Sequence, residues 1–153
     1  MRALIQRVLQ AEVRLPGGEA RRIGPGLLIY LGVGQEDGED AAKKLADKTV
    51  NLRIFSNPQG KFDYSVLDQK GEILLIPQFT LYGNLKGGRR PDFTDAAAPD
   101  KARPLFDLFA QFLRQAGLGV KTGEFGVPMA IDSLSDGPVT LWLDTEMLKR
   151  KNF

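Results

Sequence analysis

The chain contains neither histidine nor cysteine among its 153 residues, and these two absences exclude several classes of site. A chain without cysteine has no disulfide framework, no thiolate nucleophile and no thiolate metal site. A chain without histidine has no Ser-His-Asp triad, no Cys-His pair and none of the common catalytic zinc sites. Because the acidic residues form no tight cluster, we expect no metal and no cofactor. Any catalysis must then use hydroxyls, carboxylates, lysine, backbone groups or the substrate itself.

Long apolar runs are also lacking, since none approaches the roughly 20 residues of a membrane-spanning helix. The opening stretch MRALIQRVLQ is charged from Arg2 onward and has no apolar block or small-residue cleavage site of a secretory signal, so we expect a cytoplasmic protein. The net charge of +2 permits an anionic partner without requiring one. A chain of this length usually forms one domain, and we predict a single domain over residues 1–153.

What the sequence does contain is a succession of short strands and two amphipathic helices. Strands are predicted where apolar residues alternate or run together between turn residues, and helices where the spacing changes to 3.6 residues. The second helix ends at Gly117, and Asp37 or a neighbouring acid is the expected cap of the first. The predicted strands are 1–10, 11–16, 26–34, 61–68, 71–83, 127–134 and 138–144; the predicted helices are 36–55 and about 100–116, and 146–153 is a basic tail. This order predicts an α/β fold in which two helices cover one face of a largely antiparallel sheet.

The first candidate for chemistry is LIPQFTLYG, where polar residues follow an apolar strand. On pattern alone, Gln78 and Thr80 are typical of a solvated strand end. The alternative is a pocket floor, in which Gln78 offers an amide, Thr80 a hydroxyl, and backbone N–H groups near Phe79 an oxyanion hole.

The second candidate is GGRRPDF, residues 87–93. Arg89 and Arg90 between glycines and a proline are typical of an exposed loop. The alternative is a phosphate clamp, because a guanidinium holds phosphate bidentately, with Phe93 stacking on a base.

The third candidate is the pair Gly137-Pro138, which stands directly before the alternating stretch VTLWLD. A Gly-Pro pair is most often a trans turn, because only about 5–6% of X-Pro bonds in folded proteins are cis. From these residues alone the pair is interpreted as a turn between strands.

Taken together in order and length, these stretches resemble the D-aminoacyl-tRNA deacylase family, also called D-tyrosyl-tRNA deacylase. PQFTL at residues 77–81 is similar to the family's Ser-Gln-Phe-Thr-Leu motif, with Pro77 in place of its serine. SDGPVT at residues 135–140 is similar to Asn-x-Gly-Pro-Val-Thr, with Ser135 in place of its asparagine. MRALIQRVLQAEV, RRPDF and FGVPM also stand at the family's places.

The resemblance implies α/β/β layers, a homodimer with two sites at the subunit interface, and hydrolysis of the ester between a D-amino acid and the terminal adenosine of tRNA, with glycyl-tRNA also cleaved. By position, Gln78, Phe79 and Thr80 would line the pocket. Gly137-Pro138 would be the family's cis pair, reaching into the partner's pocket. Parallel carbonyls of that pair would hold the substrate's α-amino group, and the wall would leave no room for an L side chain.

Two mechanisms stay open, because an activated ester needs little help. Water can attack while N–H groups near Phe79 and Thr80 hold the oxyanion, with the tRNA 2′-hydroxyl positioning that water. Direct attack by Thr80 is the alternative. Two other functions also stay open, a non-catalytic tRNA-binding dimer of the same fold and an esterase for small acyl esters.

Overall fold

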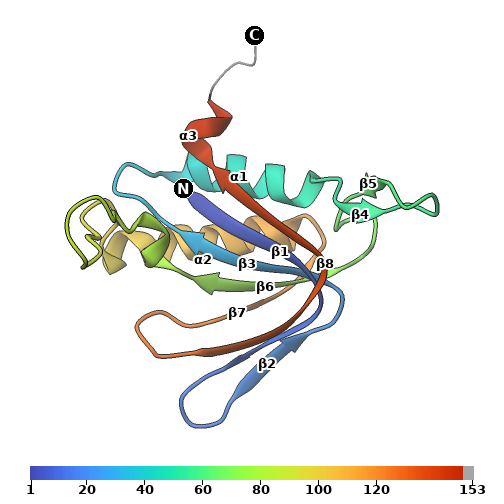
Figure 1. Ribbon diagram of the computed structural model, residues 1–153, viewed down its shortest axis with the longest axis horizontal. Helices are drawn as coiled ribbons and strands as arrows, with labels where there is room; N and C mark the ends of the chain where they lie inside the picture. The colour runs from blue at the N-terminus through green and yellow to red at the C-terminus, as the bar shows by residue number, and fades with distance from the viewer. Residues whose placement is uncertain (150–153) are drawn as a thin grey trace.

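The computed structural model describes residues 1–149 of the chain (Figure 1). The last four residues of the predicted basic tail, 150–153, lie outside the described residues. The elements follow one another as β1 (Arg2–Arg14), β2 (Ala20–Ile23), β3 (Gly26–Gly32), α1 (Glu39–Asn51), β4 (Phe55–Ser56), β5 (Phe62–Tyr64), β6 (Glu72–Pro77), the 3₁₀ helix η1 (Phe79–Tyr82), α2 (Pro99–Gln115), β7 (Gly119–Thr122), β8 (Ala130–Asp144) and α3 (Thr145–Leu148).

Two predicted pairs of strands are each one continuous strand. Residues 1–10 and 11–16 were predicted as separate strands, but β1 runs through both; 127–134 and 138–144 are joined in β8, which Figure 1 shows as one long arrow. The pairing of β1 with β8 shifts register between Gln6 and Val8 and again between Val8 and Gln10. Such β-bulges break the alternation of buried and exposed side chains without ending the strand, so the sequence pattern reads as an interruption.

The first helix is shorter than predicted and begins differently. Helix α1 covers Glu39–Asn51 within the predicted 36–55, and its N-cap is Gly38 rather than an acidic residue. The Asp37 carboxylate instead accepts hydrogen bonds from the Met1 amino group and from the N–H of Gly34, both at 2.6 Å. The prediction that Asp37 caps the helix was therefore wrong, because stronger donors lie within its reach.

The sheet is largely antiparallel, as predicted, with a parallel region beside the helices. Strand β1 pairs antiparallel with β2, β3 and β8, and β4 pairs antiparallel with β5. The pairs β3–β6 and β6–β7 are parallel. Parallel neighbours need long crossovers, and α1 and α2 lie in the two connections that supply them.

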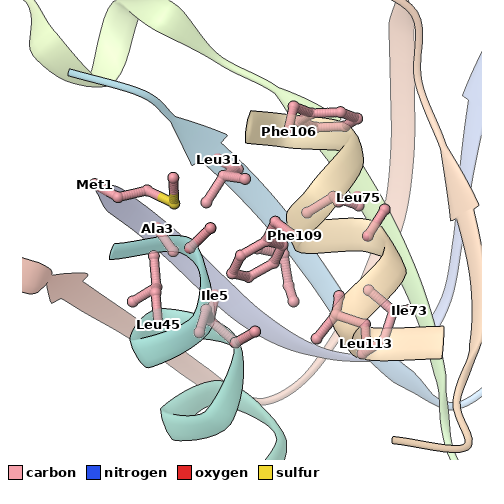
Figure 2. Close-up of a cluster of buried hydrophobic side chains, with 14 of the residues drawn as sticks. Met1, Ala3, Ile5, Leu31, Leu45, Ile73, Leu75, Phe106, Phe109 and Leu113 are labelled. Carbon is pink, nitrogen blue, oxygen red and sulfur yellow. The ribbon is translucent and has the colours of Figure 1, made fainter. Parts of the chain in front are cut away.

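The main core lies between these helices and one face of the sheet. Figure 2 shows Phe109 of α2 pointing toward side chains of the central strands, with Leu45 of α1 beside Ile5. Phe109 is fully buried, and burying such a side chain contributes about 1.5–3 kcal/mol. The labelled members of this core are Met1, Ala3, Ile5, Leu31, Leu45, Ile73, Leu75, Phe106, Phe109 and Leu113.

A second core fills the opposite face of the sheet and gives the third layer. Buried side chains of β3 and β6, such as Leu28 and Leu74, pack there against Val13 of β1 and Ile23 of β2. Strand β2 also meets β7 through side chains, since Arg21 donates to the Thr122 carbonyl at 2.7 Å. The outer half of β1, with β2, therefore folds back over the sheet, and the predicted fold class is confirmed.

None of the helices within residues 1–149 is long and apolar enough to cross a bilayer.

Candidate functional site

The polar residues after β6 lie on a single turn of 3₁₀ helix rather than on a strand. Strand β6 ends at Pro77, short of the predicted 71–83, and the Gln78 N–H makes a bond to the Leu31 carbonyl at 2.8 Å. The chain then turns, with Leu81 N–H bonded to the Gln78 carbonyl at 3.3 Å. Proline cannot donate within a sheet, so a strand that reaches Pro77 ends naturally there.

Two glycines near the end of β3 let this turn sit close to the sheet. A Cβ on Gly32 would lie 3.0 Å from the Gln78 carbonyl oxygen and 3.1 Å from the Leu81 Cβ. A Cβ on Gly34 would lie 2.8 Å from ring atoms of Tyr82. The glycines in GLLIYLGVG are therefore explained by the close approach of η1.

The turn presents its functional groups outward. The Phe79 side chain is 57% exposed, Thr80 is exposed, and the Gln78 side-chain amide donates to the Thr80 hydroxyl. Among the described residues, no hydrogen bond uses the N–H of Phe79 or Thr80 as donor. The first N–H groups of a helix have no acceptor within that helix. These two donors are therefore available to an acceptor on a bound molecule.

The side chain of Arg2, which sequence reasoning missed, holds the C-terminal end of the turn in place. The Arg2 guanidinium donates to the Leu81 carbonyl at 3.0 Å and to the Asp144 carboxylate at 3.1 Å. It also lies 4.3 Å from the centroid of the Tyr82 ring. Burial, together with the charges of Asp37 and Asp144, raises the pKa of Tyr82, so its hydroxyl stays protonated and donates to Asp37 at 3.3 Å.

The loop with the two arginines is tied to the turn through Phe93. The backbones of Asn84 and Asp92 exchange hydrogen bonds of 2.7 and 2.9 Å, closing the loop that carries Arg89 and Arg90. Both arginines are exposed. The Phe93 ring packs edge to face on Phe79, with centroids 5.0 Å apart. The structure therefore brings Phe93 to Phe79 and leaves the two arginines on an adjacent surface.

Gly137-Pro138 lies in the middle of β8 and faces solvent. The peptide bond between the two residues is cis, and Gly137 has a φ of +121°. A Cβ on Gly137 would lie 2.9 Å from Cγ2 of Val139 and 3.2 Å from Nη2 of Arg7. Only glycine fits this position without displacing its neighbours.

Arg7 is a second residue that sequence reasoning missed, and it holds the segment before Pro138. Its buried side chain donates to the Ile54 carbonyl at 2.6 Å and to the Asp136 carbonyl at 3.2 Å. Its Nε lies 3.2 Å from the Asp136 carboxylate, and Phe55 and Phe62 flank the guanidinium. The only sequence signal was an arginine followed by an apolar residue in a strand, and the β-bulge there conceals the burial of both.

The two motif segments contact different positions of β1. Arg2, beside η1, and Arg7, beside Gly137, are five residues apart on this strand. At about 3.3 Å per strand residue they are roughly 16 Å apart.

Acidic residues do not gather into a metal centre among residues 1–149, where no cluster of three or more potential ligands is found. The chemistry available at the turn is that of N–H donors, a hydroxyl and an amide.

Comparison with known proteins assigns the chain to a family. Residues 4–144 match the family model described as D-Tyr-tRNA(Tyr) deacylase. A D-aminoacyl-tRNA deacylase of Heliobacterium modesticaldum is 51% identical over 144 residues, covering 94% of this chain and 96% of the relative. A D-aminoacyl-tRNA deacylase of Roseiflexus sp. strain RS-1 is 50% identical over 149 residues, covering 97% of this chain and 96% of the relative.

Two solved structures share the fold. One, titled c-Myc DNA Unwinding Element Binding Protein, is 37% identical with a TM-score of 0.87, covering 94% of this chain and 98% of its own. Another, a probable eukaryotic D-amino acid tRNA deacylase, is 21% identical with a TM-score of 0.78, covering 93% and 97%. The resemblance noted in the sequence is thus confirmed over nearly the whole chain: the chain belongs to the D-Tyr-tRNA(Tyr) deacylase family.

Proposed function

We propose that this chain hydrolyses the ester between a D-amino acid and the 3′-terminal adenosine of tRNA, releasing the free amino acid and tRNA. The observation that carries the proposal is the exposed turn at Phe79 and Thr80, whose two N–H groups have no donor bond among the described residues. Relatives about half identical to this chain bear the name of that activity.

The turn supports a mechanism in which water attacks the ester carbonyl. The N–H groups of Phe79 and Thr80 stabilise the oxyanion that forms, and loss of one such donor typically costs about 10²–10³ in rate. Pro77 has no N–H and adds no donor. The chain has no histidine to activate the Thr80 hydroxyl, so we assign Thr80 to positioning the ester, with the substrate's 2′-hydroxyl orienting the water.

Selection against L-aminoacyl-tRNA is assigned to Gly137 and Pro138. Their carbonyls accept from the substrate's α-amino group, and the surrounding wall clashes with an L side chain while a D side chain points to solvent. Glycine has no side chain to reject, so glycyl-tRNA is also hydrolysed. The contacts of Arg7 with Asp136 and Ile54 support this role, because they hold the segment rigidly.

The selecting pair comes from a second copy of the chain. Within one chain the two segments contact β1 through Arg2 and Arg7, which are five positions and roughly 16 Å apart along the strand. Strand β8 supports a homodimer, since it pairs with β1 alone within residues 1–149 and exposes Leu134 and Trp142 by 51% and 43%. A long strand with a free edge and apolar side chains is a ready surface for another chain.

Arg89 and Arg90 bind tRNA phosphates in this proposal, and Phe93 supports the ring of Phe79 against the terminal adenosine. The exposed positions of both guanidinium groups and the packing of Phe93 on Phe79 support these roles. We place the reaction in the cytoplasm, where aminoacyl-tRNA is formed.

One assay tests the proposal against its rivals. Release of amino acid is followed from tRNA charged with D-tyrosine, with L-tyrosine and with glycine, and from a D-tyrosine ethyl ester. We expect rapid hydrolysis of the D- and glycyl-tRNAs only. Binding of tRNA without turnover would instead support a non-catalytic tRNA-binding dimer, and hydrolysis of the ethyl ester at a comparable rate would support a small-molecule esterase.

A further inference from the structure

A polar cavity that is open to solvent adjoins the end of the turn at Tyr82 and Gly83. It has a volume of about 530 Å³, and its walls include Arg2, Tyr82, Asn84, Lys86 and Asp95. Gly83 also lines it, and the Gly83 N–H is bonded to the Thr80 carbonyl at 2.9 Å. We call it the Lys86 cavity. A wall of this cavity is thus continuous with the turn that carries the reaction.

Hydrogen bonds hold Arg2 and Asn84 in place in the wall of the cavity. Arg2 is fixed by the Leu81 carbonyl and the Asp144 carboxylate, and its guanidinium covers the Tyr82 ring. Asn84 is held by backbone bonds to Asp92 of 2.7 and 2.9 Å, and its side-chain oxygen accepts from the Lys86 N–H at 2.9 Å.

Three polar groups of the cavity, all on solvent-exposed residues, have no partner among the described residues. Within residues 1–149, no hydrogen bond or ion pair is made by the Lys86 ammonium, the Asp95 carboxylate or the Asn84 side-chain NH₂. Lys86 and Asp95 also do not pair with each other, although they have opposite charges. Beside the paired Arg2, the cavity therefore offers one unpaired cation, one unpaired anion and one unpaired amide donor, which suits a ligand with both a phosphate and a base.

We propose that the Lys86 cavity binds the nucleotide that precedes the terminal adenosine of the substrate, a cytidine in tRNA. This inference rests on the proposed function, because it takes the aminoacyl-adenosine to lie at Phe79 and Thr80. The Asp95 carboxylate accepts from the cytosine N4 amino group, the pairing by which acidic side chains recognise cytosine. The Lys86 ammonium binds the phosphate that joins the two nucleotides, and the Asn84 amide donates to the cytosine carbonyl.

The chemistry of the base makes the proposal specific. Uracil differs from cytosine by an oxygen in place of the N4 amino group, so it offers Asp95 an acceptor where the carboxylate needs a donor. A site with an unpaired carboxylate therefore favours cytosine, and one well-made base contact changes affinity about tenfold or more. A phosphate contact by Lys86 does not depend on the identity of the base.

The test uses short substrates in place of tRNA. D-Tyrosyl esters of adenosine, of cytidylyl-adenosine (CpA) and of uridylyl-adenosine (UpA) are hydrolysed by the full chain, and kcat/KM is compared. We expect the wild type to prefer CpA to UpA by about tenfold. Asp95→Asn should abolish this preference. Lys86→Ala should lower kcat/KM for both dinucleotides and leave their ratio unchanged. The adenosine ester should be hydrolysed equally by all three proteins.

Matched controls lie on the exposed face of α1, where Asp47→Asn and Lys48→Ala make the same chemical changes far from the cavity. Both should behave as wild type. Equal kcat/KM for CpA and UpA in the wild type, or an unchanged preference in Asp95→Asn, would overturn the proposal.

Equilibrium binding of uncharged CpA and UpA separates this proposal from the proposed function. CpA-selective binding that Asp95→Asn removes, in a chain that hydrolyses none of the esters, would sustain the cavity and reject the hydrolytic function. Hydrolysis of the adenosine ester without any base preference would do the reverse.

Discussion

The guanidinium of Arg7 lies 3.2 Å from the carboxylate of Asp136, directly before the Gly137-Pro138 pair. The same guanidinium binds the Ile54 carbonyl, so one buried side chain joins β1, the segment before β4, and β8. The orientation of the Gly137-Pro138 pair, to which we assign the selection of D-substrates, thus depends on a residue that does not belong to either sequence motif.

Replacing Arg7 should lower both stability and turnover. Arg7→Ala leaves the carbonyls of Ile54 and Asp136 without their donor, and leaving a buried acceptor unsatisfied costs about 1–3 kcal/mol. Arg7→Lys keeps the charge but loses the planar fork, so it should restore only part of the stability. Urea denaturation gives the free energy of unfolding. The matched control is Arg14→Ala, an exposed arginine of the same strand that pairs with Glu12. Equal effects of the Arg7 and Arg14 substitutions would contradict this role.

Gly137→Ala should impair the enzyme by crowding as well as by its backbone conformation. The added methyl would lie 2.9 Å from Val139 Cγ2, at a φ of +121°. Gly17→Ala isolates the second effect, because Gly17 has a φ of +90° and open space around it. The backbone effect alone costs about 1–2 kcal/mol. We expect the thermal unfolding temperature to fall further for Gly137→Ala than for Gly17→Ala. Turnover of D-aminoacyl-tRNA should be lost in Gly137→Ala only. Similar unfolding and full activity in both variants would show that position 137 tolerates a side chain.

Thr80→Ala distinguishes the two mechanisms. If Thr80 positions the ester, kcat should fall by about 10²-fold or less, since the N–H donors remain. If Thr80 is the nucleophile, turnover should disappear, and rapid quenching of the wild type followed by peptide mass spectrometry should find an aminoacyl group on Thr80. Detection of that adduct would overturn attack by water.

Subunit mixing tests whether the site is shared. Thr80→Phe blocks the turn and Gly137→Ala disrupts the selecting pair, so each homodimer should be inactive. A heterodimer of the two variants contains one site with both changes and one with neither. An equal mixture with random exchange should therefore recover about a quarter of wild-type activity. Native mass spectrometry verifies that heterodimers form. Heterodimers without activity would mean that both segments serve the same chain's site.

Arg89 and Arg90 should account for part of the salt dependence of tRNA binding. Each phosphate contact contributes about 0.7–0.9 to the slope of log affinity against log salt concentration. The double alanine variant should show a slope that is shallower by the value of one to two such contacts. Filter binding from low to moderate salt measures this slope. Lys43→Ala, an exposed lysine of α1, is the control. A slope equal to that of the wild type would leave the two arginines as ordinary surface residues.

The features that sequence could predict are those with a regular local pattern. The apolar run that ends at Gly32 and the 3.6-residue spacing around Leu45 and Phe109 gave β3, α1 and α2, because each buries one face against the same core. Residues 78–80 stood out because polar groups follow a buried strand that meets a proline.

The rest depends on contacts between distant segments. The β-bulges of β1 hide the burial of Arg7, and Asp37 binds Met1 and Gly34 instead of capping a helix. Arg2 reaches the Leu81 carbonyl across 79 positions of the sequence, a contact that local periodicity cannot reveal. That β8 has one edge unpaired within residues 1–149 is evident only once the pairing of all described strands is known.

Strand β1 sets the spacing between the two proposed parts of the site, because Arg2 near one end contacts the turn after β6 and Arg7, five residues further along, contacts the segment before Gly137-Pro138. An insertion or deletion of one residue between them would change the spacing of these two contacts and reverse the faces of every later side chain in the strand. Differences in chain length among relatives should therefore fall in the turns at 16–18 and 57–60 and leave this interval constant.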